Sequence, residues 1–186
     1  MEKNLMIAGF GGQGVMMMGK LLSLAVCDNT DKEVTFFPSY GAQQRGGTAN
    51  CFVVMSDEPV GSPKPAKVEE LIVMNDPSFR KFSPNLKSEG VLFTNSSIVT
   101  SEIERDDITV VEVPVTEMAM ELGNLKVLNI IMLGAYIGYT QAVDDQIILD
   151  TVLKVLAKKP KLLPLNEKAF KKGLEQGKKN RIKATA

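Results

Sequence analysis

The residues from Gly9 to Gly14 have the types and spacing of a loop that binds an anion. They satisfy the pattern G-x-G-x-x-G. The apolar run Leu5 to Ala8 before them predicts a buried strand, and the apolar periodicity of Val15 to Cys27 after them predicts a helix. In such a strand–loop–helix unit, glycines let backbone amides approach a phosphate at the start of the helix. The candidate ligand-binding residues of this loop are Gly11, Gly12, Gln13 and Gly14.

Two other interpretations of this loop have to be weighed. A dinucleotide-binding unit needs an acidic residue near the end of the second strand to hold the ribose, but the predicted second strand ends in Phe36-Phe37-Pro38. A nicotinamide site therefore lacks its second element. The remaining alternative is a structural turn, in which glycines only permit close packing of strand on helix. Gly12 lies outside the pattern positions, so we expect it to have the weakest structural reason to be glycine.

A second phosphate-binding pattern overlaps the first and is rejected. Gly14 to Lys20 has the glycine and lysine spacing of a P-loop, but Leu21 follows where Ser or Thr would reach magnesium. The intervening residues are bulky and apolar, so they predict a buried helix. We therefore expect Met16 to Met18 to pack in the core and Lys20 to reach the surface.

Another polar loop follows the predicted strand Glu33 to Phe37, which we expect to end at Pro38. The segment Pro38 to Gly47 combines an aromatic side chain, a permanent cation, amides and three glycines. A guanidinium beside exposed amides can bind a phosphate or carboxylate, and the alternative is an arginine that fixes a tight turn. The candidate ligand-binding residues here are Ser39, Tyr40, Gly41, Arg45, Gly46 and Gly47.

The side chains that the sequence lacks exclude several classes of chemistry. The chain has two cysteines and no histidine, whereas iron–sulfur clusters and structural zinc usually take about four Cys or His ligands. It cannot build either site alone. Missing histidine also removes the commonest general base and the Ser-His and Cys-His nucleophile pairs. We expect no metal site and no catalytic residue in this chain, and buried, reduced thiols at Cys27 and Cys51.

The elements that must position these loops predict an α/β fold. Further strands are expected at Ala49 to Met55, Leu71 to Met74, Val91 to Thr94 and Ile108 to Val113. Helices are expected after a cap at Asn75, at Thr116 to Leu122, Lys126 to Tyr139 and Asp144 to Lys159, and after a cap at Asn166. This alternation favours a three-layer fold, a mainly parallel or mixed sheet with helices on both faces and a Rossmann-like first βαβ unit. Antiparallel members near Ala49 to Met55 remain open.

Length and charge set the organisation. The chain has 186 residues, of which 44% are apolar, so we expect one domain over residues 1–186. No apolar run approaches the ~20 residues that cross a bilayer, and no signal-peptide pattern opens the chain, which predicts a cytoplasmic protein without a membrane partner. Residues 151–186 form a basic helical segment with 11 Lys/Arg against 2 Asp/Glu. It can dock on an acidic partner or be a solvated face, but it lacks the aromatic pattern of a nucleic-acid site.

The ordered motifs strongly resemble the γ subunit, or the equivalent fused domain, of 2-oxoacid:ferredoxin oxidoreductases. The similarity is closest to the 2-oxoglutarate and 2-ketoisovalerate types, and it covers most of residues 5–138. The matching segments are Gly9 to Val15 with Gly19-Lys20, Pro38 to Gly41 with Arg45 to Gly47, Ser56 to Pro63, and Asn129 before Leu133 to Ala135.

This resemblance implies an enzyme of anaerobic metabolism that oxidatively decarboxylates a 2-oxo acid with coenzyme A and reduces ferredoxin. Thiamine diphosphate, magnesium and iron–sulfur clusters are then expected on companion α and β subunits, and on a ferredoxin-like δ subunit in some enzymes. In such enzymes this domain is associated with coenzyme A binding and with covering the thiamine site. Both loops and Asn129 would then have an anionic ligand. The family often has Glu where this chain has Gln43, which bears on a charge-dependent role there.

Two alternatives stay open at this point. One is a stand-alone NAD(P)-dependent dehydrogenase, against which the missing ribose acid counts. The other is a scaffold subunit whose loops make only protein contacts. Pyruvate, 2-oxoglutarate and ketoisovalerate are not distinguished, since specificity is expected to reside largely with the thiamine-binding chains. The isolated chain is expected to be inactive.

Overall fold

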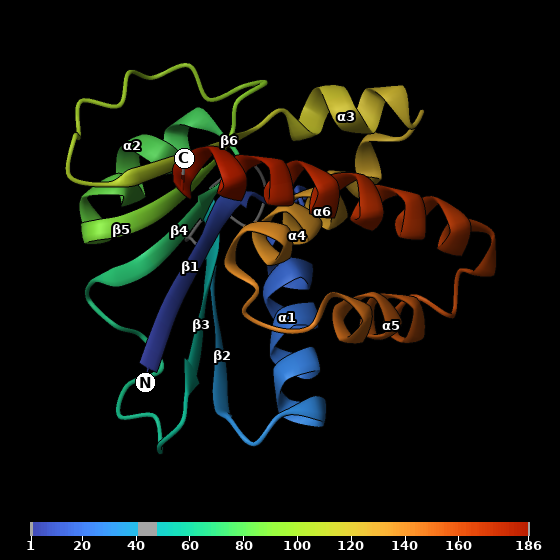
Figure 1. Ribbon diagram of the computed structural model, residues 1–186, viewed down its shortest axis with the longest axis horizontal. Coiled ribbons are helices and arrows are strands. Elements are labelled where there is room, and N and C mark those ends of the chain that lie inside the picture. Colours follow the sequence, from blue (N-terminus) through green and yellow to red (C-terminus); the bar gives the residue numbers. More distant parts are fainter. Residues whose placement is uncertain (1, 41–47, 186) are drawn as a thin grey trace.

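In the described part of the chain, six strands form one mixed sheet, in the order β2-β3-β1-β4-β5-β6 (Figure 1). The computed structural model describes residues 2–40 and 48–185. The strands are β1 (Glu2–Phe10), β2 (Glu33–Tyr40), β3 (Thr48–Ser56), β4 (Val68–Val73), β5 (Leu86–Asn95) and β6 (Thr109–Val113). Neighbours from β1 through β4 and β5 to β6 are parallel, whereas β3 lies antiparallel to both β1 and β2. The predicted mixed sheet is confirmed, and β3 is its antiparallel member.

The helices cover both faces of this sheet. They are α1 (Val15–Asn29), α2 (Asp76–Phe82), α3 (Val115–Glu121), α4 (Leu128–Thr140), α5 (Asp145–Val155) and α6 (Leu163–Thr185), with short 3-10 helices η1 (Ser83–Asn85), η2 (Leu125–Val127) and η3 (Pro160–Leu162). Leu5 and Ile7 of β1 face the core under α1, α4, α5 and α6, while Met6 and Ala8 face the smaller core that includes Phe79 and Phe82 of α2. Alternate side chains of a strand point to opposite faces, so the predicted three-layer arrangement is confirmed.

The first βαβ unit differs from a simple Rossmann unit in one respect. β1 and β2 run in the same direction, but β3 lies between them. The expectation that the second strand ends at Pro38 is wrong, because β2 continues to Tyr40 and pairs Pro38 with Cys51. Proline is tolerated here because β2 is an edge strand, where a missing N–H can face away from the sheet.

Helices α4 and α6 lie against each other at four glycines. Gly134 and Gly138 of α4 face the backbone of α6, and Gly173 and Gly177 of α6 face the backbone of α4. A Cβ at any of them would overlap a carbonyl oxygen of the partner helix. Glycine is therefore required for the close approach, which buries α4 almost all round. The predicted burial of this helix is confirmed.

Several local expectations are corrected. Asn166 does not cap the last helix, because α6 begins at Leu163 and the Asn166 Nδ2 atom donates to the Leu162 carbonyl at 2.7 Å. Helix α5 ends at Val155, short of Pro160. Cys27 is exposed, whereas Cys51 is buried as expected. The cap at Asn75 is confirmed, since its Oδ1 atom accepts from the Ser78 amide at 2.9 Å.

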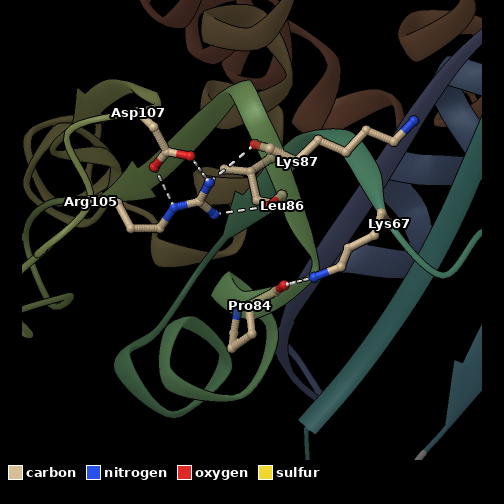
Figure 2. A network of polar contacts seen from close by, with 6 residues as sticks. All are labelled: Lys67, Pro84, Leu86, Lys87, Arg105 and Asp107. Carbon is tan, nitrogen blue, oxygen red and sulfur yellow. Dashed lines mark hydrogen bonds and ion pairs between the residues drawn. The ribbon is translucent and has the colours of Figure 1, made fainter.

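Arg105 fixes the long connection between β5 and β6 (Figure 2). Its guanidinium donates to Asp107 at 2.8 and 2.6 Å and to the Leu86 carbonyl at 2.8 Å. These hydrogen bonds hold the pKa of the Asp107 carboxyl well below its usual range. Lys67 donates to the Pro84 carbonyl at 2.5 Å, and the side chain of Lys87 extends away from Arg105 (Figure 2). The cluster therefore joins backbone segments and does not gather its cationic groups around one point.

In the described part of the chain, no helix has the length and apolar character to cross a membrane.

Candidate functional site

The two loops predicted to bind a ligand leave the sheet at the same edge. β1 ends at Phe10, which pairs with Thr48 at the start of β3, and β2 ends at Tyr40, which pairs with Ala49. The glycine loop therefore begins at the end of β1, and the second loop ends at the start of β3, on residues that pair with each other. Ser39 of β2 pairs with Asn50 of β3. The predicted site residues Gly41, Arg45, Gly46 and Gly47 lie outside the described residues.

The glycines of the first loop fall into two groups. A Cβ at Gly9 or Gly14 would meet neighbouring side chains at 2.5 to 2.8 Å, whereas a Cβ at Gly11 or Gly12 would meet no atom of the described residues within 4 Å. Gly14 also caps α1 with a left-handed φ of 75°, and Gly12 has a φ of 100°. Gly9 and Gly14 are thus required by packing or backbone conformation. Gly11 and Gly12 present exposed backbone that an anion can approach.

Gly12 does not have the weak structural requirement that the sequence predicts. A φ of 100° is rarely adopted by residues with a side chain, so a substitution strains the backbone even where space is open. Gly11 is not in this region of φ, and the described part of the chain leaves open space around it. It is therefore the better position at which to test the loop.

The Gln13 side chain joins the glycine loop to the end of β4. Its Oε1 atom accepts from the Phe10 amide at 2.7 Å and from Asn75 Nδ2 at 2.6 Å. Its Nε2 atom donates to the Met74 carbonyl at 3.0 Å. These bonds use most of what one amide side chain can offer. Gln13 therefore positions the loop, and the exposed amides beside it are left for a ligand.

The hydrogen bonds of Gln13 join the ends of β1 and β4, where the chain switches from one face of the sheet to the other. After β1 the chain enters α1 on one face, and after the adjacent parallel strand β4 it enters α2 on the other. Ligands of open α/β sheets bind at the carboxyl ends of strands at such a switch point. Asn95 at the end of β5 adds another amide, which donates to Thr116 Oγ1 at 2.9 Å. Its buried Oδ1 atom has no hydrogen-bond partner within residues 2–40 and 48–185.

Asn129 lies beside the glycine loop, as the motif order suggests. It is 7% exposed, and its Nδ2 atom approaches the Gly14 carbonyl at 3.4 Å. Gly12, Gln13, Gly14 and Asn129 line a common pocket of about 240 Å³. The structure thus brings together the first loop and Asn129.

A cation missed by the sequence analysis lies at the same edge. Lys81 of α2 donates to Thr48 Oγ1 at 3.1 Å, beside the strand that carries Phe10. Among the described residues it has no carboxylate partner within salt-bridge distance. No motif marks Lys81 in the sequence, because only the fold brings α2 next to the start of β3.

Cys51 is a poor ligand for a metal. Burial raises the pKa of Cys51 to about 12, and its thiol contacts the Val15 carbonyl at 3.5 Å. A metal or cluster needs the thiolate, which this environment disfavours.

Fold and loops together define an α/β protein with a glycine-rich loop at the carboxyl end of β1, where the chain switches sides of the sheet. Residues 4–176 match the family described as pyruvate ferredoxin/flavodoxin oxidoreductase. The chain belongs to this family, and the resemblance seen in the motifs is confirmed.

Relatives place the chain among the small subunits of this family. It is 34% identical over 184 residues to the 2-oxoglutarate synthase subunit KorC of Methanocaldococcus jannaschii, covering 96% of this chain and 95% of that protein. It also resembles the structure of a keto/oxoacid ferredoxin oxidoreductase γ subunit from Geobacter sulfurreducens, with a TM-score of 0.86, 27% identity and coverage of 97% and 98%.

Other relatives are much longer. The ketoisovalerate oxidoreductase subunit VorA of Methanothermobacter marburgensis is 33% identical over 181 residues, which is 96% of this chain but only 37% of that protein. A 2-oxoglutarate:ferredoxin oxidoreductase from Magnetococcus marinus, described with 2-oxoglutarate, coenzyme A and succinyl-CoA bound, shares the fold with a TM-score of 0.88 at 20% identity. The match covers 96% of this chain and 31% of the Magnetococcus marinus chain. The same domain therefore occurs both as a separate subunit and as part of a longer chain.

Proposed function

We propose that this chain acts as the γ subunit of a cytoplasmic 2-oxoacid:ferredoxin oxidoreductase and contributes to binding coenzyme A. The complete enzyme would convert a 2-oxo acid and coenzyme A to an acyl-CoA and CO₂ and pass the electrons to ferredoxin. Companion α and β subunits, with a ferredoxin-like δ subunit in some enzymes, would carry the catalytic groups. The γ subunit would hold the anionic part of coenzyme A and cover the active site.

The observation that carries this proposal is the edge shared by the two loops. Phe10 of the glycine loop is paired with Thr48, which follows the second loop directly. Open backbone at Gly11 and Gly12 and the ammonium group of Lys81 lie at this edge. Exposed amides and a cation suit the phosphate groups of coenzyme A. The name of the Magnetococcus marinus protein, which shares the fold and was described with coenzyme A bound, supports this ligand.

The same residues do not suit the cofactors of the reaction. The chain has two cysteines, of which one is buried with a raised pKa, and no histidine. Iron–sulfur clusters, which would carry the electrons, need about four thiolates. We therefore assign the clusters, thiamine diphosphate and magnesium to companion chains, and this chain's own residues to binding and orienting coenzyme A.

The geometry counts against an independent nicotinamide enzyme. The ribose of such a cofactor is held by an acidic residue at the end of the strand beside β1. Here β3 separates β2 from β1, and β2 carries Phe36, Phe37 and Pro38 near its end. A pure scaffold role explains the fold but gives no reason for glycine at Gly11, which has neither a left-handed φ nor a close neighbour among the described residues.

Reconstitution tests the proposal. Companion chains are assembled with and without this subunit, and coenzyme A-dependent reduction of ferredoxin by 2-oxoglutarate, 2-oxoisovalerate and pyruvate is measured. We expect activity only with the subunit present, and a higher KM for coenzyme A in a Gly11→Val enzyme. A complex that turns over equally well without the subunit would refute its role. An unchanged KM for coenzyme A in the assembled Gly11→Val enzyme would reduce the subunit to a scaffold.

A further inference from the structure

The pocket beside the glycine loop has features that coenzyme A phosphates do not require. It lies between the loop, η2, the start of α4 and the α5–α6 connection, and has a volume of about 240 Å³. Its apolar wall comes from Met17, Leu125, Leu128, Leu156 and Leu162. An anion alone gains nothing from such a wall, which favours an aliphatic ligand group.

Two buried asparagines add hydrogen-bond acceptors to this pocket. Asn129 and Asn166 are 7% and 6% exposed, and both line it. In each side chain the nitrogen donates to a backbone carbonyl, of Gly14 at 3.4 Å and of Leu162 at 2.7 Å. Because a carbonyl cannot donate, the nitrogens must face these carbonyls, which leaves each Oδ1 atom as the acceptor. Neither Oδ1 atom has a hydrogen-bond partner among the described residues.

Such acceptors favour a ligand with N–H or O–H groups. Both asparagines line the pocket and their oxygens have no protein donor among the described residues, so N–H or O–H groups of a ligand can bond them in place of water. The required ligand segment is therefore aliphatic and carries amide or hydroxyl donors.

The charge around the pocket has one sign. Lys126 and Lys159 are exposed and line it, and none of its lining residues is an Asp or Glu. Neither lysine has an ion-pair partner in the described part of the chain. The glycine loop adds the open backbone of Gly12 at the same boundary. An anionic group attached to the aliphatic segment would thus find cations and backbone amides beside the apolar wall.

We propose that this pocket holds the aliphatic, amide-bearing pantetheine arm of coenzyme A, while the glycine loop and the lysines contact its phosphates. The inference rests on the proposed function and divides the ligand between two places. A volume of about 240 Å³ is below the about 300–1,000 Å³ typical of sites for a whole drug-sized ligand, so it suits a segment of the cofactor. Leu125, Asn129 and Asn166 are then specificity-determining residues for the thiol-bearing arm.

Leu125 offers the sharpest test because it lines the pocket and is 49% exposed, so a polar replacement should be tolerated by the fold. Met120 of α3 is a matched control, since it is 60% exposed, close in sequence and not part of the pocket lining. The assembled enzyme is prepared with Leu125→Asp, with Met120→Asp and with Gly11→Val. Inhibition of coenzyme A turnover is measured with S-methylpantetheine, whose blocked thiol cannot accept an acyl group, and with adenosine 3′,5′-bisphosphate.

We expect Leu125→Asp to raise the inhibition constant of S-methylpantetheine and the KM for coenzyme A by about tenfold or more, because a hydrated carboxylate replaces an apolar contact. Adenosine 3′,5′-bisphosphate should be weakened by a smaller factor than S-methylpantetheine, since it meets the new carboxylate only through repulsion near Lys126. Met120→Asp should leave the two inhibition constants and the KM for coenzyme A within about twofold of the wild type, a change too small to represent a lost contact. Gly11→Val should weaken the bisphosphate and coenzyme A but not S-methylpantetheine.

The outcomes separate this inference from the proposed function. If Gly11→Val impairs coenzyme A use but Leu125→Asp behaves like Met120→Asp, the pocket assignment is wrong and the proposed function stands. If neither Gly11→Val nor Leu125→Asp affects coenzyme A use, both are wrong. If Leu125→Asp blocks assembly with the companion chains and Met120→Asp does not, the pocket receives a side chain of a companion subunit, and the pantetheine assignment is overturned.

Discussion

The hydroxyl of Tyr136 donates a hydrogen bond of 2.5 Å to the Oε2 atom of Glu70 inside the protein. Tyr136 is fully buried and Glu70 is 5% exposed, and Lys3 Nζ lies 3.7 Å from the other carboxylate oxygen. Burial raises the pKa of Glu70 and, together with the nearby Glu70 charge, that of Tyr136. This contact ties α4 to β4 and so helps to hold the helix whose first turn carries Asn129.

Removing this hydroxyl should destabilise the protein without touching the loops. Tyr136→Phe leaves a buried carboxylate without its donor, and hydrogen bonds to charged groups are worth about 1.5–3 kcal/mol. We expect a loss of this size in the free energy of unfolding, measured by urea denaturation at neutral pH. Tyr139→Phe on the same helix is the control, since its ring still packs edge-on against Phe93. Equal stabilities of the two variants would contradict the assigned role of the contact.

The raised pKa of Glu70 also predicts how stability depends on pH. The folded protein holds the Glu70 proton more tightly than the unfolded chain, in which this carboxyl has its ordinary pKa of 4.5. Its contribution to stability is therefore greatest below pH 4.5 and is lost as pH rises through the raised folded pKa.

Glu70→Gln removes this dependence and keeps an oxygen that can accept from Tyr136. We expect the variant to be more stable than the wild type at pH 7–8, with a difference that shrinks toward pH 4.5, as measured by melting temperature across this range. A difference of the same size at every pH would show that Glu70 does not titrate as inferred.

The close approach of α4 and α6 at their glycines leads to a separate prediction about stability. A Cβ at Gly173 would overlap the Ile131 carbonyl, so Gly173→Ala must push the helices apart. Overpacking of this kind usually costs about 1–3 kcal/mol. Urea denaturation should show a loss in this range. Gly61→Ala is the matched control, because a Cβ at Gly61 meets no atom within 4 Å. If Gly173→Ala is as stable as the control, the close crossing does not exist in solution.

Much of the fold could be predicted from the sequence because local patterns dictate it. The apolar run around Ile7, the glycine loop and the periodic helix after it identify the first strand–loop–helix unit. The cap at Asn75 and the burial of α4 also follow from local residue types. The position of β3 between β1 and β2 could not be predicted, because the order of strands depends on long-range pairing that no local pattern records.

The site was predictable only where a motif marks it. The glycine loop and Asn129 belong to motifs, and they line one pocket. Lys81, Leu125 and Asn166 reach the site through the packing of α2, η2 and α6, which the sequence does not reveal. A left-handed backbone at Gly12 was also not visible, because glycine in a loop is compatible with many conformations.

Gly12 has a left-handed φ and Gly11 does not, so substitutions at the two positions can separate backbone strain from ligand binding. Gly12→Val forces a β-branched residue into a φ of 100°, so it should lower the melting temperature, by an amount equivalent to about 1–3 kcal/mol. Gly11→Val should leave the melting temperature nearly unchanged, since its Cβ meets open space and its φ is not left-handed. Both variants should impair coenzyme A use in the assembled enzyme. If Gly11→Val folds, assembles and turns over with the wild-type KM for coenzyme A, the first loop does not bind the ligand.

The second loop is tested at Arg45, whose neighbours Gly46 and Gly47 suit exposed amides beside a guanidinium. In the assembled enzyme, Arg45→Ala should weaken coenzyme A use more than 2-oxo acid use, because a charge-assisted bond to phosphate is worth about 1.5–3 kcal/mol, on the order of ten- to a hundred-fold in affinity. Steady-state kinetics with each substrate varied in turn measure the two effects. Arg45→Lys should restore only part of the loss, since an ammonium keeps the charge but cannot form the paired bonds of a guanidinium. If Arg45→Ala assembles normally and keeps its apparent affinity for coenzyme A, Arg45 fixes the turn and the first loop binds the phosphates without it.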